Sequence, residues 1–139
     1  MQLRAPWFLR TPPETVQIAL DFLKQPTWHR PCGQDVEGIG SARGQNVYPR
    51  EMKKRGIALD YVVMDEPPFY GHDYGGKNAC KFSINEVAES VAKNVKMIRS
   101  YYPKVQFVLV EPEQSLAGGV GELSTFLDAY KANLNELPA

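Results

Sequence analysis

Apolar side chains recur at helical spacing in several segments of the chain. The clearest stripe follows Ser83 and Glu86, which are spaced as in a capping box, and it predicts a helix over residues 84–101. A second stripe predicts a last helix within 123–134, and a third predicts an early helix over 12–24. Amphipathic helices of this kind need a sheet or another helix against which to bury their apolar faces.

Two short runs, 58–64 and 104–110, are dense in β-branched and aromatic residues and predict strands covered on both faces. Each run ends in an acidic residue followed by proline, which has no N–H to continue a strand ladder. A weaker strand is expected at 34–37, and a short helix is expected between Pro49 and Gly56. Strands and helices therefore alternate along the chain.

This alternation predicts an α/β fold with a parallel sheet, and residues 1–139 are expected to form a single domain. One architecture is a small open α/β sheet. The other is a partial (β/α)₈ barrel of about three βα units, because a full barrel takes about 200 residues or more. Either sheet would leave strand edges unpaired, so association of copies of the chain to cover them is expected.

Acidic residues follow each predicted strand, at the edge where α/β proteins gather functional residues. Asp65 and Glu66 follow the first strong strand, Glu111 follows the second, and Glu37 follows the weaker one. Glycoside hydrolysis needs one carboxylic acid to protonate the leaving oxygen and one carboxylate to attack the anomeric carbon or activate water. Because adjacent strands lie about 4.8 Å apart, neighbouring strand ends suit the separation of about 5 Å found in retaining glycosidases.

Side-chain alternation ranks these acids. It predicts that Val63 packs on the helices and that Met64 and Glu66 share the opposite face, which would be the interior of a barrel. Glu66 and Glu111 are therefore the expected catalytic pair, with Asp65 in support. The alternative is that these acids only terminate strands.

The segment after the first strong strand is expected to be a loop rich in aromatic residues. Tyr70, His72 and Tyr74 stand in it, and aromatic rings above strand ends can stack on sugar faces. These three residues and Glu37 are the expected substrate-binding groups.

Metal and nucleotide chemistry have weaker support in the sequence. His72 and Asp73, with Asp65 and Glu66, form a candidate set of ligands for a divalent metal, but the chain has only two histidines and no helical HxxxH spacing. A glycine-rich segment at 38–44 precedes a predicted helix, but the residues before it are too polar for the buried first strand of a dinucleotide-binding unit. Neither a metal nor a cofactor is expected.

Composition excludes some partners. Sixteen basic residues balance sixteen acidic ones, so no basic excess points to nucleic acid or an anionic membrane. The apolar runs are too short to span a bilayer, and the first residues lack the apolar core of a signal peptide, so a soluble protein is expected. Cys32 and Cys80 leave both a disulfide and the compartment open.

Several spaced blocks within residues 30–115 resemble bacterial glycoside-hydrolase-like (β/α)₈-barrel proteins. The blocks are CGQDVEG at 32–38, DYVVMDEP at 60–67, GH at 71–72, NAC at 78–80 and VEP at 110–112. The resemblance implies a carbohydrate-active barrel, and such proteins have a complete barrel where this chain has under half of one. The matching strand-end carboxylates are Glu37, Asp65, Glu66 and Glu111.

Three functions follow from the same strand-end acids. The first is a carbohydrate-active hydrolase acting on an oligo- or polysaccharide through an Asp/Glu pair. The second is a truncated barrel that binds carbohydrate without catalysis. The third is a metal-dependent sugar isomerase or lyase.

Overall fold

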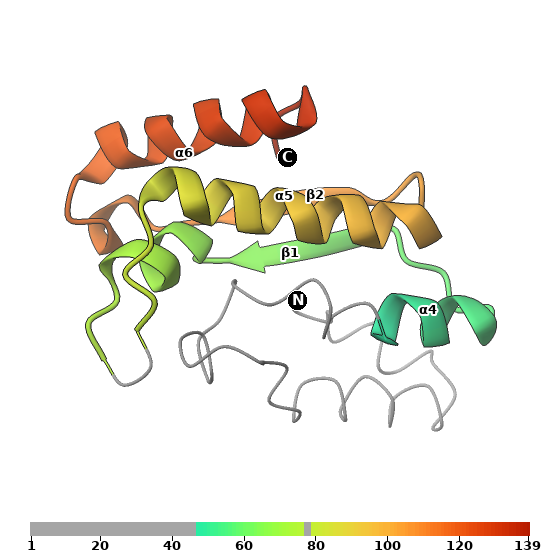
Figure 1. Ribbon diagram of the computed structural model, residues 1–139. Helices are drawn as coiled ribbons and strands as arrows, with labels where there is room; N and C mark the ends of the chain where they lie inside the picture. Colours follow the sequence, from blue (N-terminus) through green and yellow to red (C-terminus); the bar gives the residue numbers. More distant parts are fainter. Residues whose placement is uncertain (1–46, 77–78) are drawn as a thin grey trace.

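The computed structural model describes residues 47–76 and 79–139. The helix predicted over 12–24, the strand at 34–37, the glycine-rich segment at 38–44 and Glu37 lie outside the described residues. Figure 1 shows how the described elements are arranged. In chain order they are α4 (Val47–Lys54), β1 (Tyr61–Asp65), the π-helical turn η1 (Phe69–Asp73), α5 (Ile84–Tyr101), β2 (Gln106–Val110), the 3-10 turn η2 (Glu113–Ser115) and α6 (Gly119–Leu134).

The two strands pair in parallel, with α5 as the crossover between them. The register runs from Tyr61 opposite Gln106 to Asp65 opposite Val110. Within the described residues the sheet is two-stranded and open, not closed into a barrel, so the small open α/β sheet is the predicted architecture that is confirmed. The far edge of β2 is bonded by Ala139, whose N–H donates to the Phe107 carbonyl at 2.8 Å.

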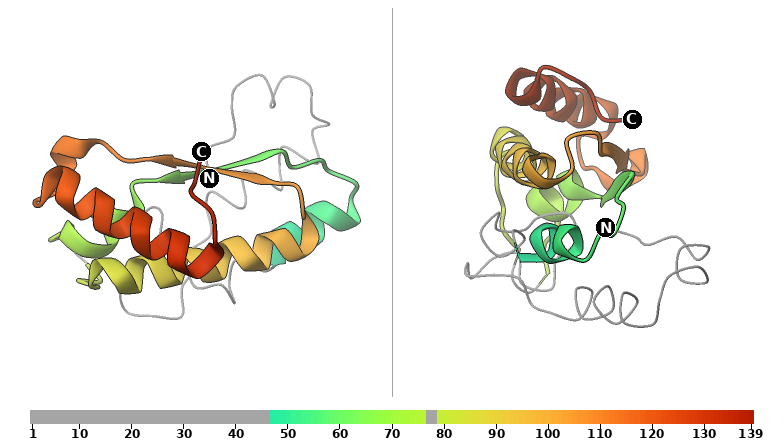
Figure 2. Two further views of the ribbon diagram at one scale, coloured as in Figure 1. Left: turned by 90° about the horizontal axis from the view of Figure 1, so that it is seen from above. Right: turned by 90° about the vertical axis from the view of Figure 1, so that its right-hand side faces the viewer.

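The helices α5 and α6 lie on one side of the sheet, as the end-on view in Figure 2 shows. Val62, Met64 and Phe107 are buried together with the apolar stripe of α5. On the other face Tyr61 is 59% exposed, and Val110 at the end of β2 is 43% exposed. The covered face of the sheet therefore carries the even-numbered residues of β1.

The expected assignment of the two faces is wrong in this respect. Met64 and Val62 pack on the helices, whereas Val63 alternates to the opposite face. A period of two divides a strand into two faces, but it does not say which one is covered when both faces are apolar. Glu66 lies beyond β1 with a φ of +47°, so the alternation does not extend to its side chain.

Helix α5 begins where its capping box predicts. Ser83 Oγ accepts from the Glu86 N–H at 3.3 Å, and Glu86 Oε2 accepts from the Ser83 N–H at 2.8 Å. The buried stripe of α5 consists of Ile84, Val87, Ala88, Val91, Ala92, Asn94, Val95 and Ile98. The short helix α4 ends before Gly56, whose φ of +72° is a conformation that glycine adopts without steric cost.

The segment expected as a loop after β1 begins with helical structure instead. Pro68 has helical angles, φ −56° and ψ −52°, and its missing N–H costs nothing at a helix start. The Tyr70 N–H donates to the Glu66 carbonyl at 3.0 Å, and the Tyr74 N–H donates to the Phe69 carbonyl at 2.8 Å. The two prolines that end β1 therefore also start η1, which fixes the aromatic residues close to the strand end.

Within the described ranges, no helix combines the length and apolar character that a bilayer crossing requires.

The docking of α6 on the core gives a stability prediction. Phe126 is fully buried, so Phe126→Ala should lower the free energy of unfolding by about 3–5 kcal/mol through lost burial and a cavity. Urea unfolding followed by circular dichroism measures it. Leu137→Ala is the control, because Leu137 is 54% exposed and its loss should change stability by less than about 0.5 kcal/mol. Equal effects of the two changes would contradict the packing of α6.

Candidate functional site

The carboxyl ends of both strands meet at one end of the molecule. In Figure 1 the turns η1 and η2 and the first turn of α6 gather at this end, beyond the arrowhead of β1. Because Asp65 pairs with Val110, the residues that follow them, Glu66 and Glu111, leave adjacent strands side by side. The structure thus brings together the three acids predicted within the described residues.

Glu66 has a strained backbone. Its φ of +47° lies in the left-handed region that residues with a side chain rarely adopt. Two hydrogen bonds hold it there: its N–H donates to the Val110 carbonyl at 2.8 Å, and its carbonyl accepts from the Tyr70 N–H at 3.0 Å. Strain of this kind is concentrated at functional sites, where the surrounding structure enforces it.

Glu111 is partly buried between β2 and the turns. Ser115 Oγ lies 3.1 Å from its Oε1 and 2.6 Å from the Pro112 carbonyl oxygen. Ser115 has one hydroxyl proton, which it can donate to either of these two acceptors. Oε2 of Glu111 is buried and has no partner at hydrogen-bond geometry in the part of the chain that the structure describes.

This environment raises the pKa of Glu111 from its ordinary value of 4.5 to about 7. Burial is the largest cause, because it removes water from the charged form. The Ser115 hydroxyl and the Phe69 N–H lower the pKa, whereas the negative charges of Glu66 and Asp65 raise it further. Near neutral pH the site therefore has a carboxyl that holds a proton beside two other acids.

Three aromatic rings cluster in and after η1. The ring centroids of Phe69 and Tyr70 lie 5.0 Å apart, and those of Tyr70 and Tyr74 lie 5.6 Å apart. Phe69 also places its N–H near the Glu111 carboxyl. The structure therefore brings the predicted aromatic residues Tyr70 and Tyr74 to the same strand ends as the acids.

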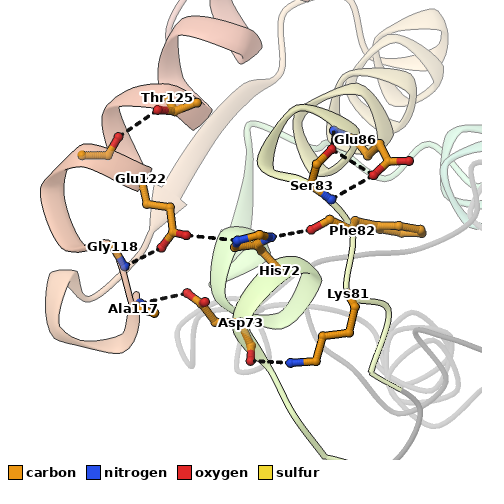
Figure 3. A network of polar contacts seen from close by, with 11 residues as sticks. His72, Asp73, Lys81, Phe82, Ser83, Glu86, Ala117, Gly118, Glu122 and Thr125 are labelled. Carbon is orange, nitrogen blue, oxygen red and sulfur yellow. Dashed lines mark hydrogen bonds and ion pairs between the residues drawn. The ribbon is translucent and has the colours of Figure 1, made fainter.

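His72 belongs to a separate polar network, drawn in Figure 3. Its Nδ1 lies 2.5 Å from the Phe82 carbonyl oxygen, and its Nε2 lies 3.1 Å from Glu122 Oε1. The neighbouring Asp73 accepts from the Ala117 N–H at 3.0 Å, and Glu122 Oε2 accepts from the Gly118 N–H at 2.9 Å. The network joins η1 to the start of α6.

Sequence reasoning missed two residues of these sites. Glu122 stands about fifty positions from His72, and its only signal is that of an acidic residue in a helix's first turn, which usually serves the helix itself. Ser115 gives no signal beyond its turn. The candidate ligand set that the sequence supported only weakly grouped His72 and Asp73 with Asp65 and Glu66, whereas the structure groups them with Glu122.

A comparison of the chain with models of protein families, with curated proteins and with solved structures found no match. What the site does therefore follows from its own residues.

The strained backbone of Glu66 predicts that a glycine variant is more stable than an alanine variant at this position, the reverse of their usual order of stability. Glu66→Gly should be more stable to unfolding than Glu66→Ala by about 1 kcal/mol, because only glycine adopts the left-handed region at no steric cost. Chemical denaturation of the two variants measures this difference. The matched control is Glu89 on the exposed face of α5, where glycine should instead be less stable than alanine by about 1 kcal/mol. If glycine and alanine variants ranked in the same order of stability at both positions, the backbone of Glu66 would not be strained.

The raised pKa of Glu111 predicts a pH dependence of stability. The folded state binds the proton more tightly than the unfolded chain, so the contribution of Glu111 is largest below pH 4.5 and falls as the pH rises to about 7. Relative to Glu111→Gln, the wild type should lose on the order of 2 kcal/mol across this window, after allowance for partial solvent access. Denaturation series at several pH values measure it. A constant difference between the two proteins would show that the carboxyl titrates normally.

Proposed function

We propose that the protein is a glycoside hydrolase acting on an oligo- or polysaccharide at the carboxyl ends of β1 and β2. The observation that carries the proposal is Glu111, a partly buried carboxyl with a pKa raised to about 7 beside Asp65 and Glu66. A carboxyl that can hold a proton near neutral pH, beside two further carboxyl groups, supplies the acid and the carboxylate that glycoside hydrolysis uses. The resemblance of the sequence blocks to glycoside-hydrolase-like barrels supports the same chemistry.

Glu111 is the general acid in this proposal. It donates its proton to the glycosidic oxygen as the bond to the anomeric carbon breaks, so the leaving sugar departs as a neutral alcohol. The carboxylate of Glu66 or Asp65 either attacks the anomeric carbon or takes a proton from a water molecule that attacks it. If it attacks, water then displaces it from the anomeric carbon and gives a proton to Glu111; if it takes a proton from water, that proton returns to Glu111 through the solvent. On both routes the water supplies the hydroxyl of the new reducing end.

The aromatic cluster of Phe69, Tyr70 and Tyr74 supplies the sugar contacts. Tyrosine offers an apolar ring face for stacking on a sugar and a hydroxyl that hydrogen-bonds to it. Because η1 begins directly after the two prolines that end β1, the cluster is positioned by the same backbone that carries Glu66. Glu37, which lies outside the described residues, stays a predicted substrate contact.

The test is sugar release from a panel of polysaccharides and aryl glycosides. Glu111→Gln and Glu66→Gln should each lower release by at least about 10²-fold, because removing a catalytic acid or base typically costs about 10²–10⁴-fold. Asp65→Asn tells whether Asp65 shares the role of Glu66. Glu89→Gln, an exposed change on α5, should leave release unchanged. Circular dichroism verifies that each variant is folded.

The products separate this proposal from its two alternatives. Hydrolysis yields a new reducing end, whereas a lyase yields a carbon–carbon double bond and an isomerase cleaves nothing. A folded wild type that binds sugars without releasing any product would favour the non-catalytic carbohydrate-binding alternative. Release that survives both Glu111→Gln and Glu66→Gln would overturn the carboxylate mechanism.

A further inference from the structure

Three side chains capable of holding a metal converge between η1 and the start of α6. His72, Asp73 and Glu122 each offer one ligand atom, and these atoms all lie within 4.8 Å of one another. The cluster shares no residue with the proposed carboxylate pair. A metal site here therefore does not depend on the proposed function. Figure 3 shows the three side chains facing one another between the two elements.

Each of the three side chains is held in place by a hydrogen bond to the backbone. His72 is held through Nδ1 by the Phe82 carbonyl, and Glu122 is held through Oε2 by the Gly118 N–H at 2.9 Å. Asp73 is held through Oδ2 by the Ala117 N–H at 3.0 Å. Protein metal sites orient their ligands by second-shell bonds of this type, including an imidazole that donates its other N–H to a backbone carbonyl.

The hydrogen bond to Phe82 determines which ring nitrogen of His72 faces Glu122. A carbonyl oxygen only accepts, so Nδ1 carries the proton that bonds Phe82. Nε2 is therefore the nitrogen that faces Glu122 Oε1, at 3.1 Å. In this orientation Nε2 is the ring atom available to a metal ion.

Ligand chemistry and geometry favour a metal ion. One imidazole and two carboxyl groups are a donor set that divalent cations accept. Ligands at about 2.0–2.2 Å from a zinc ion lie roughly 3.0–3.5 Å from one another, which matches the Nε2–Oε1 distance of 3.1 Å.

We infer that His72, Asp73 and Glu122 form a binding site for a divalent first-row cation, with Zn²⁺ as the ion whose ligand preferences the set fits best. Imidazole nitrogen and carboxylate oxygen are both common zinc ligands, and three protein ligands leave a fourth tetrahedral position for water. The other ligand atoms lie within 4.8 Å of one another, close enough for small side-chain movements to bring them onto one ion. The bound ion ties η1, which carries the aromatic cluster, to the first turn of α6.

Titration of the metal-free full chain with Zn²⁺ alone, followed by calorimetry, tests the site. One Zn²⁺ should bind per chain. His72→Gln, Asp73→Asn and Glu122→Gln should each weaken binding by at least about 100-fold, because even second-shell losses cost about 10–100-fold. The matched control is His29→Gln, which changes the chain's other histidine and should leave the affinity unchanged.

A measurement on the wild type keeps the test independent of how the variants fold. With ¹⁵N-labelled histidine, one equivalent of Zn²⁺ should shift the Nε2 resonance of His72 and leave its Nδ1 protonated. Three results would overturn the inference: no Zn²⁺ binding, an affinity unchanged by all three variants, or an affinity lost in His29→Gln. The contact between His72 and Glu122 would then be an ion pair held by a proton.

Discussion

The parallel pairing of β1 with β2 across the α5 crossover is the constraint on which the rest of the structure depends. Parallel strands can be joined only by a long connection, and here that connection is an amphipathic helix that buries one face of the sheet. The pairing also sends both strands out of the sheet at the same end. Glu66 and Glu111, far apart in sequence, become neighbours for that reason alone.

At the carboxyl end of the sheet, Glu111 and Glu66 have different surroundings. Glu111 continues from β2 into a partly buried position, where lost hydration and two neighbouring negative charges favour its protonated form. Glu66 is turned out of the strand by a left-handed backbone that the β ladder on one side and η1 on the other hold in place. The two prolines after Glu66 end the ladder and start the helical turn, so they determine where the aromatic cluster lies.

Much of this arrangement could be predicted from local sequence. The capping box at Ser83, the two β-rich runs and their acid-proline ends gave α5, both strands and the adjacency of the acids. Periodicity could not say which face of β1 packs on the helices, because Val62 and Val63 are equally apolar. The glycine and tyrosine residues after the two prolines are typical of a loop, which is why the sequence predicts a loop there. The helical start instead depends on the backbone angles of Pro68. The partnership of His72 with Glu122 depends on how α6 docks, which no local pattern encodes.

The proposed chemistry depends on Glu111, whose raised pKa lets it hold a proton up to about pH 7 within the cluster of strand-end acids. Its most direct test is a ¹³C NMR titration of glutamate side-chain carboxyls, with the Glu111 resonance assigned by its loss in Glu111→Gln. We expect a midpoint near 7 for this carboxyl. A midpoint close to its ordinary value of 4.5 would show that Glu111 is ionised at neutral pH and would remove the general acid from the proposed hydrolase.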